Sequence, residues 1–341
     1  MKPLRIVILM HDSLVPPESV EGLSQEEMNP WLMEYDVRQG LRSLGHSVHV
    51  LGVGDELLPI RRAIEELQPH LCFNLLTHFL DVGAYSAHVV SYLELLRSPY
   101  TGCNPRGLLL AGDKGLSKKV MTYHRIRVPK FSMFRLGRAL GRPRKLPFPL
   151  IVKSAAEQAS MGIAQASIVN DFEALTERVS FVHRTVGTDA IAEEYIPGRE
   201  LTIGVLGNDR LTALPIRETK FDNLPEGSEP ILTSKVKWDL AYQRKVGIRS
   251  EPAELPEAVT REIQRAAKRI FRSLELSGYA RIDLRLSEDG RPFVLEANPN
   301  PDLCAHEDFA VSAASTGLNY EQLLQKIVTL GQSYRPAWMA Q

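Results

Sequence analysis

The first hundred residues alternate between short apolar runs and segments with helical spacing. The apolar runs predict strands buried on both faces, at residues 5–9, 47–53 and 71–76. Between them, apolar residues recur every three to four positions and predict amphipathic helices at 34–44 and 58–67. This β-α-β-α-β order predicts a parallel, doubly wound sheet. The first strand is not followed by G-x-G-x-x-G, so the pattern does not support a nicotinamide-dinucleotide site.

Helical spacing returns at 89–96 and 107–123. An apolar strand then ends at Lys153, and the segment 190–208 indicates a strand, a Pro-Gly break and a second strand. Residues 259–274 predict a long amphipathic helix. The second half of the chain therefore mixes strands and helices without the strict alternation of the first.

The stretch 280–301 alternates with a period of two, which predicts a β-hairpin. One face takes Ile282, Leu284, Leu286, Phe293, Leu295 and Ala297. The other takes Arg281, Asp283, Arg285, Val294, Glu296 and Asn298. Asp289-Gly290 between the two arms is a strong signal for a two-residue turn.

A two-residue turn sets the pairing of the two arms, with Glu288 opposite Arg291. Counting outward, the predicted polar pairs are Asp283 with Glu296 and Arg281 with Asn298. The predicted apolar pairs are Leu286 with Phe293, Leu284 with Leu295 and Ile282 with Ala297.

Two carboxylates side by side, with Cβ atoms roughly 5 Å apart, repel each other. A cation between Asp283 and Glu296 would relieve this repulsion, and Asn298 adds a neutral oxygen. An all-oxygen donor set favours Mg²⁺ or Mn²⁺ over zinc, and Mg²⁺ with few protein ligands usually also holds substrate phosphates. The alternative is a solvent-facing hairpin whose charges only aid solubility, but that leaves unexplained Pro299 and Pro301, which restrict the chain just past the site.

A second candidate site follows the strand that ends at Lys153. The small-residue loop 154–162 would let backbone N–H groups approach a polyphosphate, and the lysine would add a point charge. Three acids around the later Pro-Gly break, Glu193, Glu194 and Glu200, are candidates to accept hydrogen bonds from adenine and ribose. Solvated strand-end and loop charges remain the alternative for both segments, and the basic segment 135–145 is interpreted as a solvated connector.

Composition narrows the class of protein. The chain has 341 residues, of which 44% are hydrophobic and 24% charged, as in an ordinary enzyme of two or three domains. Lys+Arg and Asp+Glu both number 41, and this balance argues against nucleic acid or an anionic membrane as the main partner. The N-terminal apolar run is too short for a signal peptide, and no run reaches the length of a membrane span. The three cysteines lack metal-site spacing, and the sparse, odd set predicts a reducing cytoplasm.

Four segments in order resemble the ATP-grasp fold, and within it the D-alanine–D-alanine ligase group. They are "SPYTGCN" with "GDKGLSKKV", "PFPLIVKS…EQASMG", "AEEYIPGRELTIGVLG" and "SGYARIDLRL…GRPFVLEANPNPDL". The resemblance covers nearly the whole chain, and the last segment is the most specific. It implies an α/β ATP-grasp fold: an N-terminal doubly wound parallel-sheet (Rossmann-like) domain at 1–102, then two α+β subdomains at 103–196 and 197–341 that sandwich ATP.

The same resemblance implies roles for individual residues. The nucleotide-binding set is Lys114, Lys153 and Ser160 on the phosphates, Glu193, Glu194, Tyr195 and Ile196 at adenine, and Glu200 on ribose. The metal set is Asp283, Glu296 and Asn298, holding two Mg²⁺ ions, with Mn²⁺ as a substitute. The catalytic set is Lys237, reaching the γ-phosphate or the intermediate, and Arg281, stabilising an oxyanion.

The sequence departs from family members that join two D-alanines at places that face the substrate. The turn after the first strand lacks their glycine pair and glutamate, and the paired serines of the phosphate loop become Ala159-Ser160. The tyrosine after the lysine that matches Lys237 becomes Trp238, and the usual Asn-x-x-Pro-Gly becomes the segment 298–302. D-alanine as the substrate is therefore in doubt, whereas the residues expected to bind ATP are retained.

The resulting hypothesis is an ATP-dependent ligase that joins a small-molecule carboxylate to an amine through an acylphosphate. The carboxylate is expected to be an amino acid or peptide, and a homodimer is implied only by the family. The alternatives are a non-catalytic ATP-binding sensor and a small-molecule kinase. Candidates to line the substrate site are His11, Asp12, Glu18, Asn74, His78, Asp302 and His306, although a lone loop histidine is more often structural or solvated.

Overall fold

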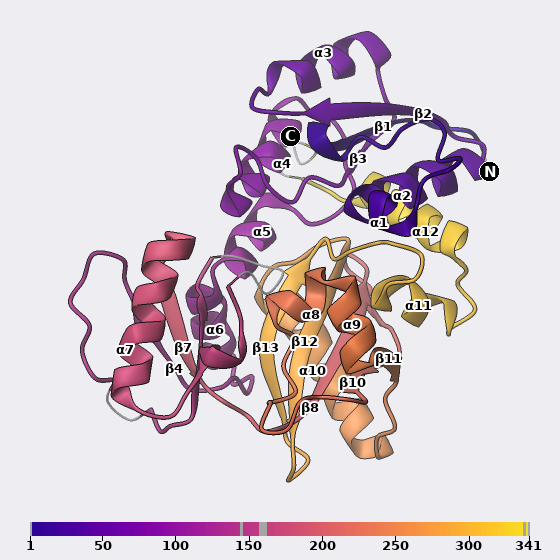
Figure 1. Ribbon diagram of the computed structural model, residues 1–341. Coiled ribbons are helices and arrows are strands. Elements are labelled where there is room, and N and C mark those ends of the chain that lie inside the picture. The colour runs from indigo at the N-terminus through magenta and orange to yellow at the C-terminus, as the bar shows by residue number, and fades with distance from the viewer. Residues whose placement is uncertain (1, 144–145, 157–161, 337–338, 340–341) are drawn as a thin grey trace.

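The computed structural model describes residues 2–143, 146–156, 162–336 and 339. Within them the strands form three sheets, which lie in three parts of the molecule (Figure 1). The first sheet is parallel and the other two are antiparallel. This agrees with the predicted order of an N-terminal parallel-sheet part followed by two α+β parts.

The N-terminal sheet contains β1 (Arg5–His11), β2 (Ser47–Val53) and β3 (Leu71–Asn74) in the order β2-β1-β3. All pairings are parallel, as the alternating pattern predicts. The helices of this part are α1 (Gln25–Met28), α2 (Leu32–Ser43), α3 (Leu58–Leu67) and α4 (Ser86–Leu95). The predicted bounds of β2 and α3 agree with the structure residue for residue.

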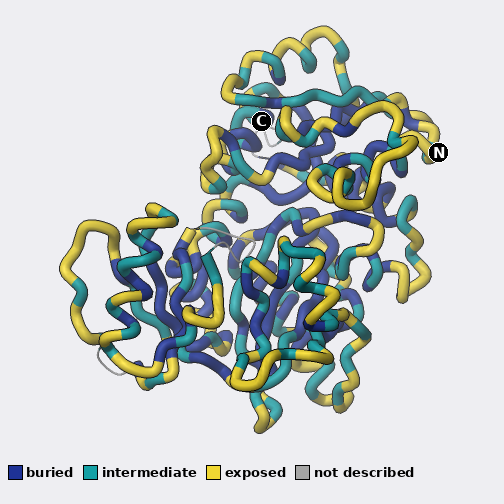
Figure 2. Tube along the Cα trace, viewed as in Figure 1, coloured by how far each residue is buried: buried dark blue, intermediate teal, exposed yellow. Residues whose placement is uncertain are grey.

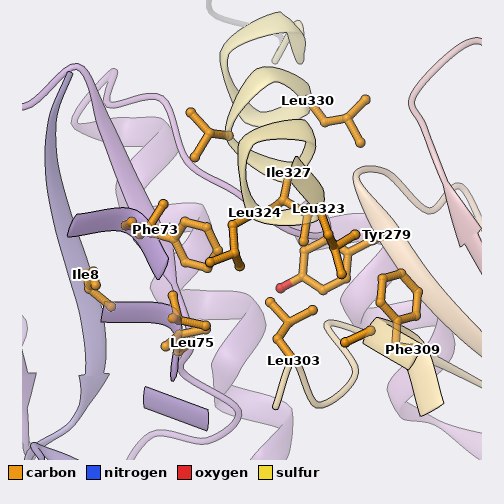
Figure 3. Packing of buried hydrophobic residues seen from close by; sticks show 14 of the residues in the cluster. Ile8, Phe73, Leu75, Tyr279, Leu303, Phe309, Leu323, Leu324, Ile327 and Leu330 are labelled. Atoms are coloured by element: carbon orange, nitrogen blue, oxygen red, sulfur yellow. The ribbon is translucent and has the colours of Figure 1, made fainter. Parts of the chain in front are cut away.

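Side chains of β1 alternate between two cores. Ile6, Ile8 and Met10 pack with α2 on one face, and Val7 and Leu9 pack with α3 and α4 on the other. The first core is completed from the far end of the chain by α12 (Tyr320–Ser333), whose apolar face lies beside Phe73 and Leu75 (Figure 3). Tyr279, Leu303 and Phe309 join the same cluster and connect the N-terminal sheet to the last part of the chain.

The second sheet has the order β4-β7-β5-β6 and is antiparallel. Its strands are β4 (Phe131–Phe134), β5 (Leu150–Ser154), β6 (Ile168–Val169) and β7 (Ala190–Glu194), and α7 (Phe172–Phe181) covers one face. The single helix predicted at 107–123 is wrong, because the structure has α5 (Pro105–Gly112) and α6 (Lys114–Tyr123) instead. Asp113 separates them: its extended backbone ends the first helix and its carboxylate accepts the Leu116 N–H at 2.8 Å, which caps the second.

The third sheet has the order β11-β10-β8-β12-β13, with β9 paired to β8. Its strands are β8 (Gly198–Leu206), β9 (Thr212–Ala213), β10 (Arg217–Phe221), β11 (Ile248–Pro252), β12 (Tyr279–Ser287) and β13 (Pro292–Pro299). Its helices are α8 (Ser234–Trp238), α9 (Leu240–Val246), α10 (Glu257–Ser273) and α11 (Asp308–Ala314). The apolar stripe of α10, including Ile263 and Phe271, packs on Ile203 and Ile282 of the sheet.

The predicted hairpin is present, but its turn differs from the prediction. The Ser287 N–H and the Ser287 hydroxyl both donate to the Arg291 carbonyl, at 3.0 and 2.9 Å, and enclose a three-residue loop, 288–290, rather than a two-residue turn. Gly290 closes the loop at φ +76°, a left-handed conformation that suits glycine. The expected pairing of Glu288 with Arg291 is therefore wrong.

A β-bulge then restores the predicted pairing from Asp283 onward, at the candidate metal-binding residues. Leu284 lies opposite Val294 and Asp283 lies opposite Glu296, so Leu295 is the extra residue of β13. The predicted pairs Leu284–Leu295 and Leu286–Phe293 are wrong, and Val294 is buried in the apolar core rather than on the polar face. Past the bulge the pairs Asp283–Glu296, Ile282–Ala297 and Arg281–Asn298 are confirmed.

Burial follows the strands, while the outer sides of helices such as α3 and α7 are exposed (Figure 2). Among the described residues, no helix combines the length and apolarity needed to cross a membrane. The three cysteines are unpaired and buried. The predicted domain bounds at 102 and 196 stay predictions, and the packing of α12 shows that the last part of the chain contributes to the N-terminal core.

Candidate active site

A cleft open to solvent lies between the second and third sheets, and we call it the cavity below. Lys153 comes from β5, Glu200 from β8, Asp283 from β12 and Glu296 from β13. The cavity therefore collects charged side chains from strands that are far apart in the sequence.

Most of the predicted site residues line this cavity. They are Lys114, Lys153, Glu194, Tyr195, Ile196, Glu200, Lys237, Asp283 and Glu296. Three predicted residues, Glu193, Arg281 and Asn298, lie just outside its lining. Ser160 lies outside the described residues.

The hairpin acids are held by polar partners. The Arg281 guanidinium donates to both carboxylate oxygens of Asp283, at 2.7 Å from Nε and 2.9 Å from Nη2. The Asn298 amide donates to the same carboxylate at 2.8 Å. The three side chains converge because Arg281 and Asp283 alternate on one face of β12 and Asn298 lies opposite Arg281 on β13.

Glu296 is paired across the cavity. Its Oε2 lies 3.3 Å from the Lys114 ammonium, at the first turn of α6. Burial alone would raise the pKa of Glu296, but the ammonium groups of Lys114, Lys153 and Lys237 outweigh it and hold that pKa far below its ordinary value. Glu296 is thus ionised and surrounded by positive charge.

A fully buried ion-pair network lies behind Lys153. Glu193 of β7 is 0% exposed, with one oxygen 3.2 Å from the Lys153 ammonium and the other 3.3 Å from that of Lys118. Lys118 also donates to the Leu295 carbonyl at 2.8 Å, the residue at the bulge. Burial would raise the pKa of Glu193, yet the two ammonium groups lower it below the ordinary value, so this carboxylate positions Lys153 rather than facing the cavity.

Arg285 is a cavity residue that the sequence analysis did not select. Its guanidinium lies 3.3 Å from Glu200 and donates to the carbonyls of Pro230 and Gly198, at 3.1 and 2.8 Å. It also lies over the Tyr195 ring, 5.2 Å from the centroid. The period-two alternation that singled out Asp283 also places Arg285 on the same face of the strand, so the sequence alone could have indicated Arg285 as a site residue.

The apolar lining was also not selected from the sequence. It comprises Ile151, Ile163, Ile231, Leu232 and Leu295. Leu295 reaches the cavity because the bulge turns it away from the core that the strict alternation assigned to it. An apolar wall beside charged groups suits a ligand with a flat ring and a charged tail.

None of the seven substrate-site candidates lines this cavity. Glu18 pairs with Arg42 at 3.1 Å, and the Asp302 carboxylate accepts the Cys304 N–H at 2.7 Å. His11 and His78 lie side by side, with ring centroids 4.7 Å apart. Their role in substrate binding stays a prediction.

Two antiparallel sheets that enclose lysines, an apolar wall and a carboxylate hairpin define an ATP-grasp ligase, an enzyme that uses ATP to join a carboxylate to an amine. Residues 120–329 match the family model described as "D-ala D-ala ligase C-terminus". The chain belongs to the D-alanine–D-alanine ligase family.

Comparison with individual protein sequences supports this family assignment. The chain is 30% identical over 310 residues to a D-alanine–D-alanine ligase of Bordetella avium, which covers 90% of this chain and 91% of that protein. It is 34% identical over 241 residues, 71% of this chain and 68% of the relative, to an uncharacterized protein of Sinorhizobium fredii. At the level of fold, D-alanine–D-alanine ligase of Bacillus anthracis, solved in complex with ATP, superposes with a TM-score of 0.74 at 22% identity over 97% of both chains.

Proposed function

We propose that this ligase joins two amino-acid-type substrates, and that Asp283, Glu296 and Asn298 hold the Mg²⁺ that accompanies ATP. The observation that carries the proposal is the convergence of Lys114, Lys153 and Lys237 with the hairpin acids in one cavity. Three ammonium groups beside two carboxylates suit a triphosphate and its metal, and a small neutral ligand would not require them.

The hairpin residues fit magnesium by the chemistry of their donor atoms. Asp283 and Glu296 are direct partners across the hairpin, and Asn298 bonds to the Asp283 carboxylate. The only metal-ligand atoms of these side chains are the carboxylate oxygens and the amide carbonyl oxygen, and Mg²⁺ and Mn²⁺ prefer oxygen. A metal held there would supply positive charge to the phosphate oxygens.

The lysines would position the phosphates. Lys153 is held by Glu193, and Lys114 is held at the first turn of α6, where its backbone N–H donates to the Ala155 carbonyl at 3.0 Å. Lys237 reaches the cavity from the short helix α8. Because these anchors are on regular elements, they would hold the γ-phosphate in line for attack with little reorganisation.

The other end of the cavity would take the nucleoside. Glu194 ends β7, and Tyr195 and Ile196 follow it. These residues, together with Ile151 and Ile231, would offer polar groups and an apolar surface to adenine. Glu200, paired with Arg285, would accept hydrogen bonds from the ribose hydroxyls.

The reaction would then proceed in two steps. A substrate carboxylate oxygen attacks the γ-phosphorus, forming an acylphosphate and releasing ADP. The amine of the second substrate attacks the acyl carbon, and the carbon–oxygen bond breaks to release phosphate. Arg281 of the hairpin, whose guanidinium is held by the Asp283 carboxylate, is the candidate to stabilise the tetrahedral oxyanion. Such stabilisation is worth about 3 kcal/mol per donor.

The names of the relatives suggest D-alanine as the first substrate to test, and the substrate-facing departures argue against assuming it. The experiment supplies ATP, Mg²⁺ and either D-alanine or pools of amino acids and dipeptides, and measures phosphate release and coupled products by mass. Phosphate release that needs both a carboxylate and an amine, with a product of their combined mass less water, supports the proposal. A phosphorylated product formed without any amine would show a kinase instead.

A further inference from the structure

Two histidines and an aspartate meet at the carboxyl end of the N-terminal sheet. His11 is the last residue of β1, and His78 and Asp81 lie in the loop that follows β3. One candidate ligand atom from each side chain lies within 4.8 Å of the others. β1 and β3 are adjacent and parallel, so both segments leave the sheet at the same edge, where parallel α/β sheets commonly bind ligands.

Each imidazole uses one nitrogen within the chain. His11 Nδ1 lies 2.7 Å from the Ser13 hydroxyl and 3.1 Å from the Asp12 carboxylate, and His78 Nδ1 lies 3.2 Å from the Thr77 hydroxyl. Histidines that bind metals typically engage their second nitrogen with such a partner, which orients the ring. This pairing leaves Nε2 of both rings as the atom for a ligand.

The third side chain is delivered by an unusual turn. Phe79 and Val82 exchange backbone hydrogen bonds of 3.3 and 3.0 Å, which leaves Leu80 and Asp81 as the two turn residues. Both have positive φ, +53° and +57°, a conformation that Asn and Gly adopt readily and that is strained for leucine. Strained turns that persist commonly serve a site, and this one brings Asp81 to the two histidines.

We infer that Nε2 of His11, Nε2 of His78 and the Asp81 carboxylate form a site for a divalent transition metal of the Zn²⁺ class. Imidazole nitrogens favour Zn²⁺, Ni²⁺ or Cu²⁺, whereas the oxygen set of the hairpin favours Mg²⁺, so the two sites differ in chemistry. Three protein ligands leave a position open to water or to an anionic group such as a carboxylate. None of the three residues lines the nucleotide cavity, so the inference does not depend on the ATP site.

The side chains can close on an ion. Asp81 is exposed and both histidines are half-buried, so water and ions reach the cluster, and an ion bound there would draw the Asp81 carboxylate in to a bond length of about 2.0–2.2 Å. The cysteines, the other strong zinc ligands, are all buried. Binding at this cluster is therefore expected to involve nitrogen and oxygen without sulfur.

The test titrates the full-length protein, freed of metal by a chelator, with Zn²⁺ in millimolar Mg²⁺ that saturates the hairpin. We expect one equivalent of Zn²⁺ to bind, and Co²⁺ in its place to show the visible absorption of a nitrogen–oxygen site without a thiolate band. His11→Ala, His78→Ala and Asp81→Asn should each weaken Zn²⁺ binding by at least about 10-fold, since the loss of even a partner of a metal ligand typically costs that much. Asp81 is exposed, so its variant keeps the fold even if a histidine variant does not.

The matched controls are His88→Ala, an exposed histidine on α4, and Glu296→Gln at the hairpin. Both should leave the Zn²⁺ affinity unchanged. The inference is overturned if no stoichiometric Zn²⁺ binds in the presence of Mg²⁺. It is overturned equally if Asp81→Asn binds Zn²⁺ as tightly as the wild type and the His88→Ala control do.

Discussion

At the scale of single residues, Glu296 shows how the fold sets the charge of one group. Its carboxylate lies 3.3 Å from Lys114, and three lysines keep its pKa well below the ordinary value despite burial. It is therefore ionised throughout the range in which an enzyme works. Its proposed role depends on that charge, because an ionised carboxylate is the kind of oxygen ligand that binds Mg²⁺ beside substrate phosphates.

Glu296→Gln keeps the shape of the side chain and removes this charge. Turnover should fall by about 100-fold or more, since the proposed metal loses a ligand, while the circular dichroism spectrum stays that of the wild type. The matched control is Glu288→Gln in the exposed loop of the same hairpin, which should retain full activity. Full activity in the first variant would remove the hairpin from the mechanism.

Glu34 differs from Glu296 in that burial raises the pKa of its carboxyl group. It is 2% exposed, one of its oxygens has no hydrogen-bond partner among the described residues, and burial raises its pKa to about 7. Since the folded state keeps the proton that the unfolded state loses above about pH 4.5, stability falls as pH rises from there to about 7 and stays lowered above it.

Glu34→Gln should abolish this loss. The variant should gain stability relative to the wild type as pH rises from 4 to 8, up to about 3 kcal/mol, as measured by urea unfolding at several pH values. Glu65→Gln, an exposed residue of α3, should show no such trend. A pH-independent difference for Glu34→Gln would mean that Glu34 is ionised in the folded protein.

At the scale of elements, the hairpin shows what the sequence can and cannot predict. Alternation placed Asp283 opposite Glu296 correctly, although the turn has one more residue than predicted and the bulge at Leu295 cancels the error. A bulge has no clear signature in hydrophobic alternation, because Leu295 suits either face. The strands and helices of the first hundred residues were predicted well, because each carries its own period.

The ion-pair network behind Lys153 was beyond such prediction. Lys118 lies in an amphipathic helix, where a lysine usually faces water, yet it is 0% exposed and bonds to Glu193 and Leu295. Its partners are distant in the sequence, and no periodicity links them. Contacts of this kind are set by how α6, β7 and β13 pack together.

This network predicts that removing Glu193 destabilises the protein more than removing Lys118. Glu193→Gln leaves two buried ammonium groups without their carboxylate and should cost about 3–5 kcal/mol in the free energy of unfolding. Lys118→Met leaves Glu193 still paired with Lys153 at 3.2 Å and should cost less. Denaturant unfolding of both variants measures the order, and a reversed order would show that Glu193 does not bridge the two lysines.

At the scale of the whole molecule, the last helix of the chain packs on the N-terminal sheet. α12 packs on the sheet of β1 and β3, with Leu324 beside Phe73 in one core (Figure 3). The amphipathic pattern of the last helix predicts an apolar face but does not say which sheet that face covers. The N-terminal core is thus completed only when the last helix is in place.

Leu324→Ala should destabilise the protein by about 2–5 kcal/mol and increase amide hydrogen exchange in β1, because Leu324 is 0% exposed in that core. Leu95→Ala, at a position that is 81% exposed, should change neither quantity. Unchanged exchange in β1 for Leu324→Ala would indicate that the N-terminal core is stable without α12.

The central claim for the whole molecule is chemical: the substrate carboxylate is activated by phosphorylation before the amine attacks. The direct measurement supplies an acid whose carboxylate carries ¹⁸O, beginning with D-alanine and extending to any acid that supports coupling, and weighs the phosphate released. The account predicts one ¹⁸O transferred to each phosphate, because the oxygen that attacks phosphorus leaves with it. Coupled product formed with unlabelled phosphate would contradict the acylphosphate and the ligase mechanism built on it.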